Sequence, residues 1–432
     1  MSARDSALRI LIACRRQGAW ADAELKQVLS RDALDRRDAA LAARLVYGVL
    51  QNRMLLDHWI GLFVHRTRDL QPVVLDILRL AVLQLRFFDR VPDSAAVNEA
   101  VEQAKRLANA KAAGLVNAVL RNMLRQPELL TEPEALSVRY SHPAELVELL
   151  RQNVPEELLE ALLRAHNEAP AAYLQTNTLL CDTASLVERL TQEGFEAAAH
   201  PWLPDCVRVT GGSVEQSKAF AEGLFYVQDP AARLAVTAAG PCPGARVLDC
   251  CAAPGGKSFA AAIAMQNRGS IRSCDLHRHK IELIRKGAER LQLGIVEAAC
   301  RDASVPVPEE AGSYDLVIAD VPCSGLGVIR KKPDIRYKDL KQTEALPSVQ
   351  AAILENQSAL VLPGGVLLYS TCTILRRENE AVVERFLSAH PEYAAEPFAL
   401  PGGIRSETGM LTLLPCVHDT DGFFIAKLRR HP

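Results

Sequence analysis

Apolar residues recur at three- and four-residue spacing along the first part of the chain. The stretches 39–63 and 73–88 show this pattern most clearly, and such spacing places the apolar side chains on one face of an α-helix. A Pro-Asp-Ser sequence typical of a helix start precedes a third run, and residues 114–125 form a fourth. We therefore predict that residues 1–126 form an all-helical domain.

A change in this pattern separates a second region from the helical one. The stretch 127–134 is acidic and contains proline, which is typical of a linker. After two further helical stretches, the strand-like AAYLQTN and CVRVT flank the helical TASLVERLTQEGF. Residues 135–235 are therefore predicted to form a small α+β module.

From residue 236 onward, short apolar stretches alternate with helical ones. The apolar stretches are ARVLDCCAA, GSIRSCDL, YDLVIADVP and GGVLLYSTCT. Regular strand–helix alternation is typical of a parallel, doubly wound sheet with helices on both faces. The 432 residues thus predict a multidomain protein that ends in an α/β, Rossmann-like domain at 236–432.

Composition and charge narrow the function classes. Hydrophobic residues make up 49% of the chain and charged residues 24%, which excludes wholesale disorder and a disulfide-rich miniprotein. No apolar run reaches the length of about 18 residues typical of a membrane span. Residues 1–125 carry 20 Lys and Arg against 13 Asp and Glu. This basic region suggests a polyanionic partner, although a helical bundle with solvated arginine-rich faces would explain the same balance.

The eleven cysteines form no CxxC pair and no Cys/His cluster at zinc spacing, and the first residues lack the features of a signal peptide. We therefore expect reduced thiols, no bound metal and a cytoplasmic location. Most cysteines are expected to be buried as small hydrophobic residues. These are Cys14, Cys181, Cys206, Cys242, Cys250, Cys274, Cys300 and Cys416.

Carboxylates and a glycine-containing turn follow the predicted strands of the last region. Gly255 and Gly256 supply a turn where a ligand can approach the backbone, and Asp275 ends the next strand. The residues expected to hold a cofactor are Cys251, Ala252, Ala253, Pro254, Gly255, Gly256, Lys257, Asp275, Asp302 and Asp320. Because the carboxyl ends of parallel strands form the ligand-binding edge of such sheets, four ordered strand ends argue against a purely structural turn.

The turn lacks the glycine pattern that binds a pyrophosphate. This absence and the nearby carboxylates favour a cofactor without phosphates. S-adenosylmethionine fits, because it combines an adenosine, a cationic sulfonium and an amino-acid tail. A nicotinamide-dependent dehydrogenase is the weaker interpretation, because the turn lacks the glycine pattern that binds the pyrophosphate of its cofactor.

Three motifs resemble the family of RNA cytosine-5 methyltransferases. They are VLDCCAAPGGKS, DVPCSGLGVIRKKPDIRY and YSTCTILRRENE. The stretches AVNEAVEQAKRL and GLVNAVLRNMLR resemble the helical RNA-binding fold of the antitermination factor NusB. The fusion of both parts resembles bacterial 16S ribosomal RNA cytosine-5 methyltransferases, which implies S-adenosylmethionine as the cofactor and 16S ribosomal RNA as the partner.

Methylation of carbon 5 of cytosine needs a nucleophilic thiolate. Its addition to carbon 6 makes carbon 5 nucleophilic, and a second group must then assist loss of the carbon 5 proton and release of the thiolate. Cys323 and Cys372 each follow a predicted strand, and this chemistry alone does not decide which one attacks. The resemblance implies that Cys372 is the nucleophile and that Cys323 assists product release.

Two further residues complete the expected catalytic group. Asp320 is the natural partner for the N3/N4 edge of cytosine. Lys257 lies at the mouth of the same predicted pocket and is the cation expected to lower a thiol pKa.

The loop after Cys323 combines basic and aromatic residues, namely Lys331, Lys332, Arg336 and Tyr337. Such residues suit phosphate contact and base stacking beside the site, and a solvated loop is the alternative. Because duplex stacking hides carbon 6, we expect the target cytidine to be unpaired or flipped.

Two other functions stay open. A transfer RNA cytosine-5 methyltransferase would share the catalytic motifs, and the NusB-like region favours ribosomal RNA by analogy. A non-catalytic RNA-binding or antitermination factor is disfavoured, because both cysteines, Asp320 and the Pro-Gly-Gly turn are present. The sequence shows no evident oligomer interface, so we expect a monomer.

Overall fold

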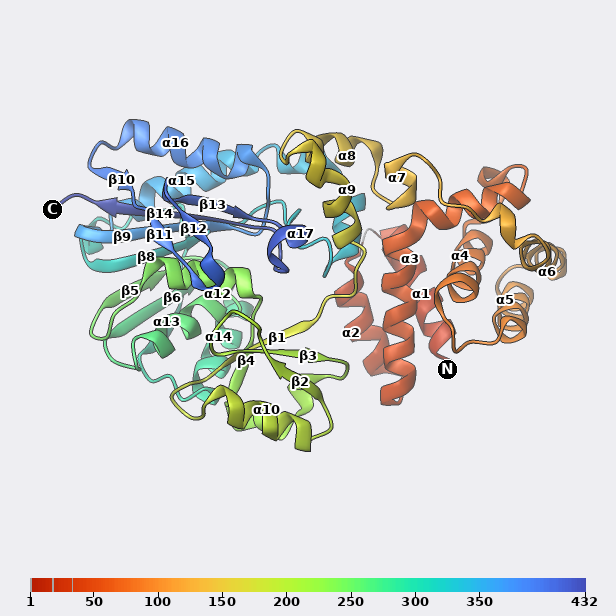
Figure 1. Cartoon of the computed structure of the whole chain (residues 1–432), viewed down its shortest axis with the longest axis horizontal. Helices are drawn as coiled ribbons and strands as arrows, with labels where there is room; N and C mark the ends of the chain where they lie inside the picture. The colour runs from red at the N-terminus through yellow and green to blue at the C-terminus, as the bar shows by residue number, and fades with distance from the viewer. Residues whose placement is uncertain (1, 18, 33) are drawn as a thin grey trace. The chain divides into compact units, whose positions relative to one another are not determined.

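The computed structural model describes residues 2–17, 19–32 and 34–432. It divides into two compact units, each with its own hydrophobic core (Figure 1). The first unit comprises Met1–Glu168 and Ile329–Lys338, and the second comprises Ala169–Val328 and Asp339–Pro432. Among the described residues, no helix is both long and apolar enough to cross a membrane.

The first unit is helical, as predicted for its N-terminal part. Its helices are α1 (Ala3–Gln17), α2 (Ala21–Asp32), α3 (Arg36–Phe63), α4 (Pro72–Phe87), α5 (Asp93–Leu107), α6 (Ala110–Arg125), α7 (Leu136–Arg139), α8 (Ala144–Arg151) and α9 (Glu156–Ala165), with the 3-10 turns η1 (Thr67–Asp69) and η2 (Pro127–Leu129). The apolar faces of α1 to α6 meet in one core around Leu45 and Ile77. The stretch predicted as a linker packs on this core, because Leu130 is buried in it and the Trp59 indole donates a hydrogen bond to the Thr131 carbonyl.

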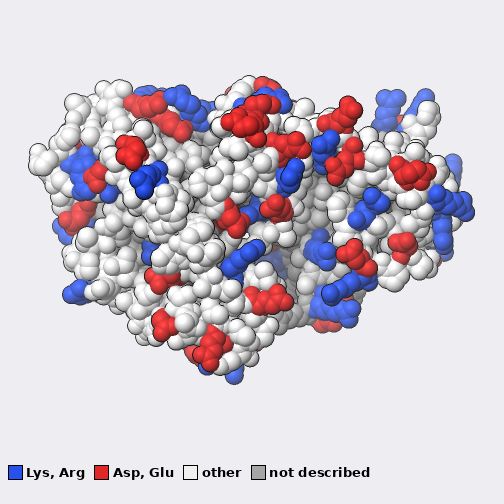
Figure 2. Space-filling view, in the orientation of Figure 1, with Lys and Arg blue, Asp and Glu red and all other residues white. Residues whose placement is uncertain are grey.

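Basic side chains gather on part of the first unit. Figure 2 shows Lys and Arg over the end formed by α5 and α6 and over one end of α3. Lys111, Arg121 and Arg125 of α6 are exposed. The excess of basic residues in the sequence is therefore present on the surface of the helical unit.

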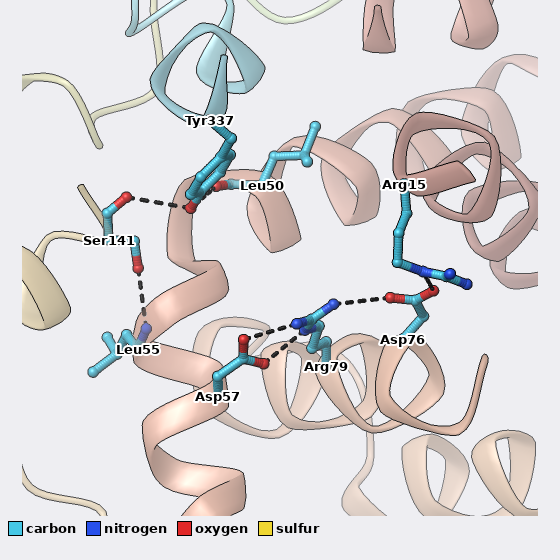
Figure 3. Close-up of polar contacts among 8 residues, drawn as sticks. All are labelled: Arg15, Leu50, Leu55, Asp57, Asp76, Arg79, Ser141 and Tyr337. Atoms are coloured by element: carbon cyan, nitrogen blue, oxygen red, sulfur yellow. Dashed lines mark hydrogen bonds and ion pairs between the residues drawn. The ribbon is translucent and has the colours of Figure 1, made fainter. Parts of the chain in front are cut away.

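A segment from far along the chain belongs to this first unit. Ile329–Lys338, which we call the strap, contains the 3-10 turn η5 (Pro333–Tyr337) and follows the loop that carries Cys323. Tyr337 donates its hydroxyl hydrogen to the carbonyl oxygens of Leu50 and Ser141 (Figure 3). Arg336 is buried and donates hydrogen bonds to the carbonyl oxygens of Gln51, Tyr140, Ser141 and His166 and to the Asn167 side-chain oxygen.

The strap corrects one expectation from the sequence. Arg336 and Tyr337 do not suit contact with RNA, because their polar groups are committed to protein carbonyls inside the first unit. These hydrogen bonds replace the water that burial removes, and burial lowers the pKa of Arg336 to about 10. Lys332 is exposed and stays available for the expected phosphate contact.

The second unit begins with a small antiparallel sheet. Its strands, in the order β2-β3-β1-β4, are β2 (Glu196–Ala199), β3 (Cys206–Thr210), β1 (Ala172–Thr176) and β4 (Phe225–Val227). The helices α10 (Thr183–Gln192) and α11 (Lys218–Ala221) pack with this sheet, and Leu186 and Leu190 of α10 share a core with Val207. The helices α7 to α9, which the sequence analysis included in the α+β module, group with the first unit instead. The sequence missed β2 and β4, because both are short and show no clear alternation of apolar and polar residues.

The larger sheet has the order β10-β14-β9-β8-β5-β6-β7, and β13 pairs with β14. Its strands are β5 (Arg246–Asp249), β6 (Ser270–Asp275), β7 (Val296–Cys300), β8 (Tyr314–Asp320), β9 (Val361–Thr371), β10 (Tyr393–Ala395), β13 (Met410–Leu413) and β14 (Phe423–Arg430), while β11 (Phe398–Ala399) and β12 (Arg405–Ser406) form a separate pair. Strands β5 to β9 are parallel. The prediction of a wholly parallel sheet is wrong at one edge, because β14 returns antiparallel beside β9 with Ile425 opposite Ser370.

Helices cover both faces of this sheet, as predicted (Figure 1). They are α12 (Pro230–Ala239), α13 (Gly256–Ala264) and α14 (Arg278–Arg290) on one face, α15 (Leu346–Ser358) and α16 (Glu380–Ala389) on the other, and the single turn α17 (Pro415–His418). Successive side chains point to opposite faces, so Val247 packs in the core under α13 whereas Leu248 packs in the core under α15. Burial on both faces explains the nearly continuous apolar strands.

Candidate active site

The carboxyl ends of the parallel strands bring the predicted site residues to one edge of the sheet. Asp275 ends β6, Asp320 ends β8, and Asp302 follows β7. Cys323 and Cys372 follow β8 and β9, which are neighbours in the sheet. The topology therefore gathers groups that lie up to about a hundred residues apart in the sequence.

The turn between β5 and α13 depends on two glycines. Gly255 has a φ of +115°, and a Cβ atom there would lie 2.3 Å from the Phe259 ring. A Cβ atom on Gly256 would lie 2.8 Å from Nε2 of Gln228. Side chains at these two positions would therefore displace the turn.

A cavity of about 370 Å³ lies beside this turn. The predicted cofactor residues that line it are Cys251, Ala253, Asp275, Asp302 and Asp320. The predicted residues Ala252, Pro254, Gly255, Gly256 and Lys257 do not line it; Pro254 and Gly256 instead line a separate hollow of about 380 Å³. Of the residues expected to hold the cofactor, the structure thus brings together mainly those at the carboxyl ends of the strands.

Sequence reasoning missed several residues that line the same cavity. Leu276 and His277 follow β6 directly, and Leu276 is 57% exposed. Their position after a strand end is a signal that would have identified them. Val349 and Ile353 reach the cavity from α15, and nothing in their local sequence indicates this.

The cavity carboxylates have defined hydrogen-bond partners. Asp275 accepts hydrogen bonds from the backbone N–H groups of Ala253 at 3.3 Å and His277 at 3.1 Å, and it pairs with Lys280 at 3.6 Å. Asp302 accepts hydrogen bonds from the backbone and hydroxyl of Ser304, which lowers the pKa of Asp302. Both groups are therefore placed as acceptors at the strand ends.

Asp320 is held by two side chains. Lys257 Nζ lies 2.6 Å from one carboxylate oxygen, and the Ser370 hydroxyl donates to the other at 2.8 Å. Lys257 also lies 5.0 Å over the Phe423 ring. Among the described residues, Lys257 forms no hydrogen bond or ion pair with Cys323 or Cys372, so its direct partner is the Asp320 carboxylate rather than a thiol.

The sulfurs of Cys323 and Cys372 lie 3.1 Å apart. The hydrogen bond with Cys372, burial and the negative charge of Glu378 raise the pKa of Cys323 well above the usual value for a thiol. These surroundings disfavour the thiolate form of Cys323, and either thiol can donate the hydrogen bond between the two sulfurs.

A buried network holds the two cysteine loops, and the sequence analysis did not identify it. Glu378 is buried and accepts hydrogen bonds from the Ser324 backbone at 2.9 Å and from Gln350 Nε2 at 3.0 Å. Gln350 also donates to the Pro322 carbonyl, and the Ser324 hydroxyl donates to Thr373. The sequence around Glu378 is polar and charged, so nothing in it indicated that this carboxylate is buried, and its partners appear only in the fold.

The remaining cysteines differ in exposure, and all eleven are free. Cys206, Cys250 and Cys274 are buried as expected. The expected burial is wrong for Cys242 and Cys300, which are exposed, because Cys242 lies in the loop before β5 and Cys300 ends the edge strand β7. Among the described residues there is no cluster of His, Cys, Asp and Glu that could hold a metal ion.

Comparisons with known proteins assign each part of the chain. Residues 236–429 match the family described as 16S rRNA methyltransferase RsmB/F. Residues 1–125 match the NusB family, and residues 142–215 match the ferredoxin-like domain of RsmF/B-like methyltransferases.

Similar proteins and structures agree with this assignment. The probable ribosomal RNA small subunit methyltransferase B of Bacillus subtilis (strain 168) is 36% identical over 99% of both chains. The ribosomal RNA small subunit methyltransferase B of Vibrio cholerae is 34% identical over 91% of this chain and 90% of the relative. The crystal structure of PH0851 covers 98% of both chains with 26% identity and a TM-score of 0.79.

The crystal structure of NSun6 from Pyrococcus horikoshii with SFG covers 67% of this chain and 98% of its own, with 22% identity and a TM-score of 0.60, and it shows a likeness in fold. The assignment of this chain to a family rests on relatives that are more than 30% identical over at least nine-tenths of both chains. The chain belongs to the RsmB/F family of 16S rRNA methyltransferases, which are RNA cytosine-5 methyltransferases.

Proposed function

We propose that this chain transfers a methyl group from S-adenosylmethionine to carbon 5 of a specific cytidine in 16S ribosomal RNA. The observation that carries the proposal is the contact between Cys323 and Cys372, beside Asp320 and the cavity at the strand ends. Two thiols and a carboxylate are the groups that addition, methyl transfer and elimination at a cytosine ring require. The names of the full-length relatives support the RNA substrate.

The cavity suits the chemistry of S-adenosylmethionine. Leu276, Val349 and Ile353 offer apolar surface to an adenine ring, and Asp275 accepts hydrogen bonds from ribose hydroxyls. Asp302 and Asp320 add negative charge opposite a sulfonium cation. When bound, S-adenosylmethionine supplies an electrophilic methyl group.

The residues of this chain then have separate roles. Cys372 adds through its sulfur to carbon 6 of the ring, which makes carbon 5 nucleophilic. Asp320, oriented by Lys257 and Ser370, holds the N3/N4 edge of the base. After methylation, Cys323 in its thiolate form accepts the carbon 5 proton. The electron pair of that C–H bond re-forms the double bond between carbons 5 and 6, and the Cys372 sulfur leaves carbon 6 as a thiolate.

The proposal extends to the RNA and to the organisation of the chain. The target cytidine is unpaired or flipped, because a stacked base does not expose carbon 6. We divide the monomeric chain into an RNA-binding domain at 1–126, an α+β module at 135–235 and a catalytic domain at 236–432. A bacterial ribosomal RNA substrate places the reaction in the cytoplasm.

Bisulfite sequencing of 16S ribosomal RNA and transfer RNA tests this function. RNA is taken from cells with the gene, without it, and with a gene that encodes Cys372→Ala. We expect one cytidine of 16S ribosomal RNA to lose its protection in the second and third strains. Loss of protection in a transfer RNA alone would favour the transfer RNA alternative, and unchanged patterns would favour a non-catalytic RNA-binding factor.

The role of Asp275 is tested by calorimetry with S-adenosylmethionine. Asp275→Ala removes the acceptor for the ribose hydroxyls and should weaken binding by about 1–3 kcal/mol. Glu309→Ala, which removes an exposed carboxylate of the same unit, is the matched control and should bind as the wild type does. Equal affinity of both variants would remove Asp275 from the cofactor site.

A further inference from the structure

Glu378 is a fully buried carboxylate beside the Cys323 loop. Its oxygen Oε2 accepts hydrogen bonds from the Ser324 backbone at 2.9 Å and from Gln350 Nε2 at 3.0 Å. Its other oxygen, Oε1, has no hydrogen-bond partner among the described residues, and none of their Lys, Arg or His side chains forms an ion pair with this carboxylate.

The two arginines next to Glu378 in the chain are directed elsewhere. Arg376 pairs with Glu384 at 2.8 Å, and Arg377 donates a hydrogen bond to the Thr343 hydroxyl at 2.6 Å. The charge of Glu378 therefore has no direct counter-charge in the described part of the chain.

Holding the Cys323 loop does not require this charge. Glu378→Gln would place a carbonyl oxygen where Oε2 lies, keep both hydrogen bonds, and put a neutral amide nitrogen at the unpartnered Oε1 position. Burial of a carboxylate without a cation costs more free energy than burial of a neutral amide. The fold thus bears a cost that the two hydrogen bonds do not explain.

Cys323 is the reactive group closest along the contacts of Glu378. Ser324, whose backbone donates to Glu378, is the next residue after Cys323. Gln350 fixes the residue before Cys323, because its Nε2 also donates to the Pro322 carbonyl at 3.0 Å. Both chain neighbours of Cys323 are therefore tied to the pair formed by Glu378 and Gln350.

The charge of Glu378 acts on the Cys323 sulfur. The hydrogen bond with Cys372, burial and the charge of Glu378 raise the pKa of Cys323 in the free protein. The first cause is absent from the covalent intermediate, because the Cys372 sulfur is then bonded to carbon 6 of the ring. Burial and the carboxylate remain, and a neighbouring negative charge makes a thiolate a stronger base.

The other titratable groups that face Cys323 add little to this effect. Asp320, at the end of β8, is paired with Lys257 at 2.6 Å. Tyr369 of β9 is buried, and burial raises its pKa well above the usual value, so its phenol stays neutral. The Tyr369 hydroxyl donates to the backbone carbonyl of Glu378.

From this geometry we infer that Glu378 is a positioning residue for release of the methylated RNA: it holds the Cys323 loop, and its charge makes the Cys323 thiolate a stronger base for the carbon 5 proton. In this step the thiolate binds the proton, the electron pair of the C–H bond re-forms the double bond between carbons 5 and 6, and Cys372 leaves carbon 6 as a thiolate. Glu378 is buried and acts through Cys323. The inference rests on the proposed function, because it takes carbon 5 of a cytidine to be the methylated atom.

Glu378→Gln separates the charge from the hydrogen bonds. The full-length chain is mixed with S-adenosylmethionine and 16S ribosomal RNA from cells that lack the gene, and denaturing gels follow the decay of the covalent adduct from about pH 6 to about pH 9. The pH of half-maximal release should fall by about one unit, and maximal release should be severalfold slower. A weaker base loses its own proton more easily but accepts the carbon 5 proton more slowly.

The thiol of Cys323 is also measured without RNA. Iodoacetamide is added at each pH to chains that carry Cys372→Ala, with and without Glu378→Gln, and mass spectrometry follows the peptide that contains Cys323. The midpoint of the alkylation rate should lie about one pH unit lower with Glu378→Gln. Alkylation needs no methyl transfer, so this result is separate from bisulfite sequencing, which detects a failure of the proposed function.

Two further variants serve as controls. Glu384→Gln changes a carboxylate side chain that is 50% exposed in the same unit, and it should leave both pH profiles as they are in the wild type. Glu378→Asp keeps the charge on a shorter side chain. Its release is expected to be slower because the loop is displaced, whereas its alkylation midpoint should stay near that of the parent chain.

Two results would overturn the inference. The first is a pair of pH profiles for Glu378→Gln that coincide with those of the parent chains, which would show that the carboxylate only holds the loop. The second is an alkylation midpoint that falls equally in Glu378→Asp and Glu378→Gln, together with an equal fall in melting temperature. That result would show that disruption of the loop, and not loss of the charge, alters Cys323.

Discussion

Cys323 and Cys372 touch, yet their surroundings differ. The hydrogen bond with Cys372, burial and the charge of Glu378 raise the pKa of Cys323. Either thiol can donate the hydrogen bond that joins the two sulfurs. At the scale of single residues, the order of roles therefore rests on the family resemblance, and replacement of each cysteine tests it.

The two cysteines should fail in different ways when they are replaced. Cys372→Ala should abolish methyl transfer and form no covalent RNA adduct. Cys323→Ala should still attack and methylate, and then accumulate as a covalent protein–RNA complex, because elimination has lost its helper. Denaturing gels with substrate RNA and S-adenosylmethionine measure the adduct, and Cys242→Ala, an exposed cysteine outside the site, is the control. An adduct in Cys372→Ala but not in Cys323→Ala would reverse the roles.

At the scale of elements, the strap is where the function indicated by the sequence and the position found in the structure differ most. Its basic and aromatic composition indicates an RNA-binding loop, but Arg336 is buried among carbonyl oxygens of the first unit. Beside Arg336 lie His142 and His166, whose rings are stacked and joined by a hydrogen bond of 3.1 Å. The strap and these histidines together form a polar cluster inside a helical unit.

Arg336→Met should destabilise the first unit by about 3–5 kcal/mol, because the substitution leaves several buried carbonyl groups without a donor. Lys332→Met, an exposed position of the same strap, should have almost no effect. Urea unfolding followed by tryptophan fluorescence measures the difference, since Trp20 and Trp59 lie in the first unit and Trp202 in the second. A stable Arg336→Met variant would show that the cluster is not structural.

The histidine pair should make the first unit labile to acid. Burial and the charge of Arg336 lower the pKa of His166 from 6.5 to about 3, and the same causes lower the pKa of His142. A base whose pKa falls on folding stabilises the fold fully above its unfolded pKa, and that stability is lost as the pH drops from about 6.5 towards 3. In this window His166 contributes up to about 1.4 kcal/mol per pH unit, and His142 acts in the same direction.

Melting temperatures between pH 8 and pH 4 test this expectation. His166→Asn should flatten the pH dependence, because it removes one of the groups that must take up a proton on unfolding. His65→Asn, at an exposed position of the same unit, should leave the dependence as it is in the wild type. Parallel curves for all three proteins would exclude the histidine pair as the cause.

At the scale of the whole molecule, basic and acidic groups are concentrated in different units, although the net charge is close to zero. The net charge is −2, yet exposed basic side chains gather over α5 and α6 of the first unit (Figure 2). The carboxylates of the candidate active site lie in the second unit. This separation suits a chain in which one unit binds a polyanion and the other holds a cationic cofactor.

Replacing Lys111, Arg121 and Arg125 together by Gln should weaken RNA binding and reduce its salt slope by about 2–3, because up to three phosphate contacts are lost. Cofactor affinity should not change. The matched control replaces three exposed arginines of the second unit by Gln, namely Arg268, Arg385 and Arg405. Filter binding at several salt concentrations gives the slopes, and equal slopes for both triple variants would remove α6 from the RNA-binding surface.

Much of the architecture could be predicted from local patterns. Helical periodicity identified the first unit, and strand–helix alternation identified the parallel core of the large sheet. Short or poorly alternating strands such as Glu196–Ala199 carried no such signal, and the return of β14 beside β9 depends on contacts between distant segments. Periodicity shows that a side chain is buried but not which segment buries it.

The sequence by itself determined which residues meet at the sheet edge. Asp275, Asp320 and Cys372 end or follow parallel strands, and parallel strands place their carboxyl ends at one edge whatever the surrounding packing. Only the tertiary structure decided that Lys257 pairs with Asp320, that Glu378 holds the Cys323 loop and that Arg336 turns into the first unit. The physical reason is that strand ends follow from a local pattern, whereas the partner of a buried charge is chosen by chain segments that are distant in sequence and close in the fold.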